Sequence, residues 1–128
     1  MSRRLMSLGW VAGASLMLLS TTVNAGEVSC SVTKPVFPMF DGSCRDGCDC
    51  RAAIHQINCC GSRAAIGINY LEQERFDEAE AICEAQYPAC DCFDRGILAD
   101  DGQSTFDAAR VAAFCNEGTC ATFVLPEK

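Results

Sequence analysis

The chain has 128 residues, of which 49% are hydrophobic, 21% are charged and 11 are cysteine, and its formal net charge is −7 at pH 7. A chain of this length forms one domain at most. The acidic charge argues against binding to nucleic acid or to an anionic membrane surface, because both require a basic surface. The composition is also too hydrophobic for a disordered chain. It excludes these classes but indicates no activity.

Residues 1–25 have the pattern of a secretory signal peptide. Two arginines near the start precede a short apolar run at 5–19, and the small residues Val-Asn-Ala follow at 23–25. The run is too short, and too rich in glycine and serine, to span a membrane as a mature helix. We therefore predict a mature chain that begins at Gly26, has no membrane span and is secreted or periplasmic.

The export route stays open. Ser-Arg-Arg-Leu-Met at 2–6 is similar to a twin-arginine motif, which would imply folding before export. The other possibility is a lipoprotein signal, in which Cys30 would carry the lipid. Glu-Val-Ser at 27–29 lacks the apolar residue and the small pair that precede a lipidated cysteine. A product without a lipid anchor is therefore favoured.

The eleven cysteines all follow residue 25, and their density is typical of a disulfide scaffold in a short exported chain. A domain of this size has a small core, and each disulfide adds about 2–4 kcal/mol by restricting the unfolded chain. We therefore predict five disulfides without assigning their pairing. The ten cysteines expected to form them are Cys44, Cys48, Cys50, Cys59, Cys60, Cys83, Cys90, Cys92, Cys115 and Cys120.

An odd number of cysteines leaves one thiol outside five intramolecular bridges. We predict that this thiol is Cys30, because its segment is polar and lies close to the predicted cleavage site. Terminal segments are mobile unless something ties them down. An exposed Cys30 could then link two chains in a disulfide dimer.

Metal binding by clustered thiolates is the alternative use of these cysteines. Cys-Asp-Cys at 48–50 and at 90–92, and Cys-Cys at 59–60, bring thiols close together. A Cys-x-x-Cys pair, the usual spacing of zinc ligands, is absent from the sequence. We therefore predict neither a metal site nor a cofactor.

Residues 26–47 are predicted to be irregular, because prolines and a run rich in Asp, Gly and Ser at 41–47 favour turns. Asp41, Asp46 and Asp49 raise the possibility of a calcium loop. The chain lacks an acidic residue at the position where an EF-hand has its bidentate glutamate. Turn formation is therefore the favoured role of these aspartates.

Residues 48–128 predict a small disulfide-stapled α+β domain. Short apolar runs at 51–57 and 64–68 enclose an Asn- and Gly-containing loop, which indicates a hairpin. Runs at 110–115 and 120–125 around Asn-Glu-Gly indicate a second hairpin. We expect these four strands to form one small antiparallel sheet.

The segment 70–86 is predicted to be a helix capped by Asn69, and the sheet is expected to carry it on one face. Phe76, Ala79 and Cys83 recur at helical spacing, so Cys83 is expected to link the helix to the sheet. Residues 93–109 are expected to form a loop with a turn at 100–102. The acidic residues of the helix are expected to form a solvated face: Glu74, Asp77, Glu78, Glu80 and Glu84.

Catalysis has little support in the sequence. His55 is the only histidine and could act as a base toward Cys59 or Cys60, but vicinal cysteines in an exported chain are more often bridged. The chain has no nucleophile elbow, zinc-binding histidine motif or phosphate-binding loop. We therefore predict that the protein is not an enzyme.

The cysteine pattern carries a family resemblance. It resembles small exported cysteine-rich proteins of myxobacteria-like bacteria, a group with no assigned activity. The residues that carry this resemblance are Cys48-Asp49-Cys50, His55, Cys59-Cys60-Gly61, Asn69, Cys83, Cys90-Asp91-Cys92 and Cys115-Asn116-Glu117-Gly118-Thr119-Cys120. A weaker likeness is to the eight-cysteine motif of plant lipid-transfer proteins, which are all-helical. We predict an exported binding or structural module of unknown partner, with a thiolate metal-binding protein as the alternative and a secreted enzyme as the least favoured class.

Overall fold

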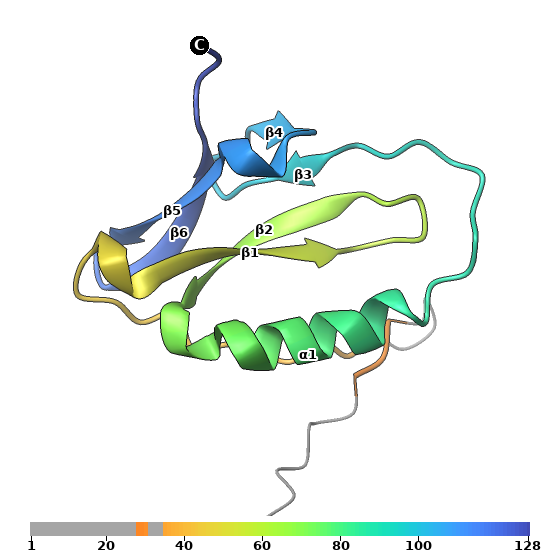
Figure 1. Cartoon of the computed structure of the whole chain (residues 1–128), viewed down its shortest axis with the longest axis horizontal. Coiled ribbons are helices and arrows are strands. Elements are labelled where there is room, and N and C mark those ends of the chain that lie inside the picture. The colour runs from red at the N-terminus through yellow and green to blue at the C-terminus, as the bar shows by residue number, and fades with distance from the viewer. Residues whose placement is uncertain (1–27, 31–34) are drawn as a thin grey trace, which may run out of the picture.

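The computed structural model describes residues 28–30 and 35–128, and the predicted signal peptide lies outside this range. The fold is a small α+β domain in which a hairpin, β1–β2, lies between a helix and a second hairpin (Figure 1). Its elements in chain order are a 3-10 turn (Gly47–Asp49), β1 (Cys50–Gln56), β2 (Arg63–Asn69), a 3-10 turn (Tyr70–Glu72), α1 (Gln73–Glu84), β3 (Ile97–Leu98), β4 (Ser104–Thr105), a 3-10 turn (Ala108–Arg110), β5 (Val111–Asn116) and β6 (Thr119–Val124).

Both predicted hairpins are confirmed, but they do not join in one sheet. β1 and β2 pair antiparallel, β3 adds parallel to β2, and β4 pairs antiparallel with β3. β5 and β6 form a separate two-stranded sheet. The predicted loop at 93–109 contains β3 and β4, joined by a turn in which the Gly102 amide donates to the Ala99 carbonyl.

Two sheets form because β2 is apolar on both faces. Ile68 lies on one face and packs with Ala53 and with Phe76 of α1. Ala65 lies on the other face and packs with Ile97 and with the β5–β6 hairpin. A strand buried on both sides reads as a continuous apolar run rather than as an alternating one. The run at 64–68 is such a segment, and β5–β6 covers its second face.

Gly67 lies where β6 crosses β2. A Cβ atom built on Gly67 would lie 2.3 Å from the carbonyl oxygen of Cys120. Because no side chain fits at that distance, the contact between the two backbones requires glycine at this position.

The predicted helix is confirmed, with shorter bounds. The Asn69 side chain accepts from the Leu71 amide and caps a 3-10 turn, and α1 follows from Gln73 to Glu84. Phe76, Ala79 and Cys83 are buried, as their spacing predicts.

The β5–β6 hairpin turns through two residues. Glu117 and Gly118 both have positive φ, 48° and 83°, which matches the twist of the flanking strands. This turn brings Cys115 and Cys120 into register as direct partners across the hairpin.

The segment before β1 packs onto the domain. Phe37 and Phe40 contact the core beside Phe76, and Ser43 forms a bridge with Thr119 of β6. Asp41 accepts from the amide and the hydroxyl of Ser43, and these hydrogen bonds lower the pKa of its carboxyl group. Turn chemistry is thus the observed role of Asp41. Within the described residues, no helix is long and apolar enough to cross a membrane.

Candidate functional site

Five disulfides hold the domain together. They pair Cys30 with Cys83, Cys44 with Cys115, Cys50 with Cys120, Cys59 with Cys90, and Cys60 with Cys92. Within the described part of the chain Cys48 is the free cysteine, and it is exposed. The number of bridges is as predicted, but the prediction of Cys30 as the unpaired residue, and of Cys48 as a bridged one, is wrong.

Cys30 is bridged because the helix ties down its segment. The Cys30 amide donates to the Gln86 side chain at 2.8 Å, and the Gln86 amide group donates back to the Val28 carbonyl at 2.8 Å. Cys30 is 8% exposed and bonds to the buried Cys83 of α1. Cys83 therefore links the helix to the N-terminal segment rather than to the sheet. A dimer through Cys30 loses its basis, because that thiol is consumed within the chain.

We expect titration of the denatured, unreduced protein to find one thiol per chain, at Cys48. Cys48→Ser should remove this thiol and leave the melting temperature unchanged, because an exposed side chain outside the core contributes little to stability. Mass spectrometry of a peptide digest after alkylation locates the label. Label on Cys30 or Cys83 would contradict the assignment.

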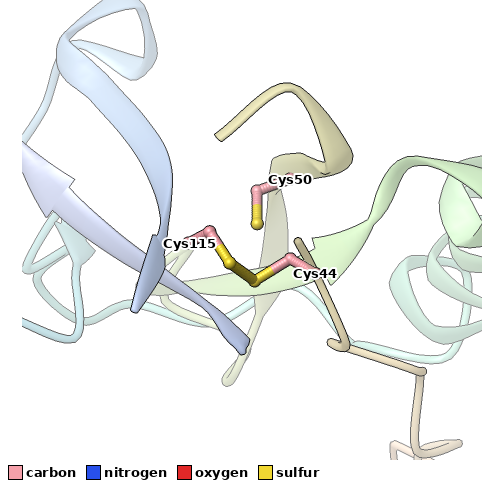
Figure 2. Close-up of side chains that lie close together, drawn as sticks. All are labelled: Cys44, Cys50 and Cys115. Atoms are coloured by element: carbon pink, nitrogen blue, oxygen red, sulfur yellow. A yellow bond between two sulfur atoms is a disulfide. The ribbon is translucent and has the colours of Figure 1, made fainter. Parts of the chain in front are cut away.

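Two disulfides meet beside the β5–β6 hairpin. Figure 2 shows the bond between Cys44 and Cys115 with Cys50 next to it, and the sulfurs of these three residues lie within 4.8 Å of one another. Cys50 is bonded to Cys120, so the two cysteines facing each other across the hairpin each bond to a different partner. These bonds attach the start of β1 and the segment before it to the second sheet.

This sulfur cluster is not a thiolate metal centre in the oxidised protein. Zinc binds deprotonated cysteine, and a sulfur within a disulfide is not a thiolate. The same holds for the cluster of Cys59, Cys60 and Cys92, since each of these is bridged.

A second pair of disulfides closes one end of the molecule. Cys59 and Cys60 lie in the β1–β2 loop, and their partners Cys90 and Cys92 lie in the segment that follows α1. In Figure 1 this loop and this segment lie at the same end, near the last turn of α1. Two cavities open in this part of the structure.

His55 and Glu80 form a buried polar pair between β1 and α1. The His55 Nδ1 atom lies 2.6 Å from a Glu80 carboxylate oxygen, and the other oxygen accepts from the Gln56 amide at 2.6 Å. The side chains of the pair are 15% and 9% exposed. The His55 ring stacks on Phe37 with ring centres 3.9 Å apart. The Glu80 carboxylate thus satisfies an edge amide of β1 and orients the imidazole ring.

The prediction that Glu80 belongs to a solvated face of the helix is wrong, because Glu80 is buried. Its spacing could have revealed this. Glu80 follows Phe76 by four residues and precedes Cys83 by three, so it lies on the apolar stripe of the helix. A carboxylate on such a stripe needs a buried partner, and His55 is that partner.

Glu80→Gln is expected to lower the free energy of unfolding by about 1–3 kcal/mol, because a neutral amide replaces the charged group that is hydrogen-bonded to both His55 and the Gln56 amide. Urea denaturation measures the change. The matched control is Glu78→Gln, an exposed position on the same helix. Equal stability of the two variants would show that the buried pair does not stabilise the fold.

The first cavity lies beside this pair and has a volume of about 650 Å³. Its wall is mostly apolar, and it contains His55 and two of the bridged cysteines, Cys30 and Cys59. The apolar lining comes from Pro35, Phe37, Ile57, Tyr87 and Pro88.

Two polar side chains in the wall of this first cavity, Gln86 and Tyr87, already have partners. The Gln86 side chain is bonded to the N-terminal segment through both its oxygen and its nitrogen. The Tyr87 hydroxyl donates to the Gln56 carbonyl at 3.2 Å, while burial and the Glu80 carboxylate raise the pKa of Tyr87. The rest of the wall is chiefly ring faces and aliphatic carbon.

The fold and the five disulfides define a small disulfide-rich α+β domain. Comparison of the chain with protein-family models, with curated proteins and with solved structures gave no match. Inferences about its function therefore come from the cavities and their chemistry.

Proposed function

We propose that the protein is an exported binding module, and that its first cavity binds a small neutral molecule with an apolar, ring-shaped body. The observation that carries this proposal is the mostly apolar cavity of about 650 Å³. Ligand sites are usually concave and apolar, with a few polar groups that orient the ligand. A volume of this size fits within the range of such sites, about 300–1,000 Å³.

The rigidity of the walls supports this proposal. The Cys30–Cys83 bond holds one side of the cavity to α1, and the Cys59–Cys90 bond holds the other side to the segment after the helix. A site that is already formed loses less conformational entropy when a ligand binds.

The proposal also holds that the protein is not an enzyme. His55 is the one histidine of the chain, and the nearby Cys59 and Cys60 are both bridged, so neither supplies a thiolate for it to activate. The His55 ring stacks on Phe37 and forms part of the cavity wall, which supports a role in shaping the cavity.

Export is part of the proposal, and the number of disulfides supports it, because such bonds persist in oxidising compartments. The native protein is expected to begin at Gly26 and to be found in the periplasm or the medium. Intact-mass analysis of the purified product tests this. A cytoplasmic product that retains residues 1–25 would contradict it. The resemblance to exported cysteine-rich proteins of myxobacteria-like bacteria stays a prediction.

Indole, a neutral aromatic probe, tests the cavity itself. In two-dimensional NMR spectra we expect its addition to shift the amide signals of Cys30, Cys59 and Tyr87, which line the cavity. Tyr87→Ala is expected to weaken binding about tenfold, because it removes a ring from the wall.

Tyr70→Ala is the matched control for this experiment. Tyr70 is the other tyrosine of the chain, lies outside the cavity and is 47% exposed. This variant should bind indole as the unchanged protein does. Equal weakening by both substitutions, or signal shifts confined to other residues, would overturn the proposal.

A further inference from the structure

A second cavity, of about 580 Å³, opens next to the first. Ile57 and Asn58 line both cavities. The wall of the second cavity differs in its charge, because it contains two arginines, Arg63 of β2 and Arg95 of the segment before β3. We call it the arginine cavity.

Arg63 has hydrogen-bonding capacity that the protein does not use. Its Nε atom is buried and is the one buried side-chain nitrogen or oxygen in the described residues without a hydrogen-bond partner. An Asp94 carboxylate oxygen lies 3.9 Å from a terminal nitrogen of Arg63, an ion pair that is too long for a hydrogen bond. A buried donor without a partner is costly and calls for an acceptor.

The guanidinium group of Arg95 has no hydrogen-bond partner within the described part of the chain. Its backbone amide donates to the buried Ser62 hydroxyl at 3.0 Å, which holds the segment in place. Arg63 has one carboxylate at ion-pair distance, that of Asp94, whereas Arg95 has none within the described residues. Two arginines that bring free donors to one cavity therefore favour an anion there.

The arginine cavity also has exposed apolar side chains in its wall, beside the polar residues Asn58, Ser62 and Ser104. Phe93 is 93% exposed, and Leu98 and Ile57 are each 49% exposed. The Cys60–Cys92 disulfide holds the Phe93 segment against the β1–β2 loop. An exposed apolar surface around a site of defined charge is typical of a surface that binds a ligand.

We propose that the arginine cavity binds an amphipathic anion, in which a carboxylate or phosphate group contacts Arg63 and Arg95 and an alkyl tail lies against Phe93 and Leu98. A guanidinium group binds either anion through paired hydrogen bonds, which the terminal nitrogens of Arg63 and Arg95 would donate. The apolar tail would remove the exposed Phe93 ring and the Leu98 side chain from water. This inference concerns a separate site and does not depend on the neutral ligand of the first cavity.

Calorimetric titration of the oxidised protein with octanoate and with octyl phosphate tests the inference. We expect at least one of them to bind, and octanol and octylamine, which have the same tail without the negative charge, to bind at least tenfold more weakly. Comparison of the two anions shows which head group the cavity prefers. Each methylene removed from the tail should weaken binding by up to about fourfold, the effect of one buried methylene group.

Arg95→Gln is the variant that tests the site, because Arg95 is exposed and its guanidinium has no described partner, so the fold should not depend on it. It is expected to weaken binding of the anion about tenfold. Arg45→Gln, at an exposed position that does not line this cavity, is the control with the same change in charge. It should bind as the unchanged protein does.

Three results would overturn the inference. They are equal binding of octanol and the anions, equal weakening by Arg95→Gln and Arg45→Gln, and no binding of either anion. The indole experiment is independent of these results, since Tyr87 does not line the arginine cavity.

Discussion

Gly67→Ala is expected to lower the free energy of unfolding by about 3 kcal/mol or more, the upper range for overpacking a filled interior. The added Cβ atom would lie 2.3 Å from the Cys120 carbonyl oxygen and 2.5 Å from its carbonyl carbon. Both atoms belong to the backbone of β6, so the clash can be relieved only by moving the second hairpin away from β2. Urea or thermal denaturation of the oxidised protein measures the loss.

The control for this substitution is Gly47→Ala. A Cβ atom on Gly47 would meet nothing within 4 Å, and its φ is not positive. This variant should be as stable as the unchanged protein or slightly more so, because alanine restricts the unfolded chain. A Gly67→Ala variant that unfolds at the same urea concentration as Gly47→Ala would show that β6 does not cross β2 this closely.

Removal of the Cys50–Cys120 disulfide by the double substitution Cys50→Ala, Cys120→Ala is expected to cost about 3 kcal/mol. Because the Cys44–Cys115 bond remains, the loop that Cys50–Cys120 closes runs only through 44–50 and 115–120, and the entropy of closing a loop of this size accounts for about this amount. Both residues are buried, at 4% and 6% exposure. The double variant leaves no stray thiol at either position.

Cys48→Ala is the control, because it also removes a cysteine but no bridge. Denaturation without reductant compares the two variants. After full reduction the difference between them should shrink, since the constraint on the unfolded chain is then absent from both. A loss below about 1 kcal/mol for the double variant would contradict the pairing or its importance.

The elements that sequence reasoning predicted well are those held by local interactions. The helix over 70–86 follows from apolar spacing of 3.6 and from the Asn69 cap, and the structure places α1 within that range. The second hairpin follows from Asn-Glu-Gly, because Glu117 and Gly118 adopt the positive φ values that such a turn needs. These features depend on neighbours a few residues away.

The division of the strands into two sheets depends on contacts between segments that are far apart in the sequence, and local sequence patterns do not predict those contacts. The run Ala-Ala-Ile-Gly-Ile at 64–68 was compatible with one sheet or with burial on both faces. Burial of Ala65 against the β5–β6 hairpin and of Ile68 against α1 separates the strands into two sheets. Gly67 allows the backbones of β2 and β6 to touch, and the need for glycine at this position follows only from the place of β6 in the fold.

The two cavities could not be predicted from the sequence, for the same reason. Arg63 and Arg95 are 32 positions apart in number, and no local pattern links them to each other or to Phe93. The Cys60–Cys92 bond and the pairing of β2 with β3 bring these residues to one place. The burial of Glu80, by contrast, could have been predicted, because Glu80 lies on the same face of the helix as Phe76 and Cys83.

The sequence by itself determined the class of this protein: a small acidic domain, stapled by cysteines, with one helix and two hairpins, since composition, spacing and turn residues act over short stretches of chain. Tertiary structure decided which cysteines pair. Cys30 meets Cys83 across 53 positions because Gln86 holds the N-terminal segment against α1. A disulfide forms only where two Cβ atoms come within about 4 Å of each other, and that distance depends on how the packed layers bring remote segments together.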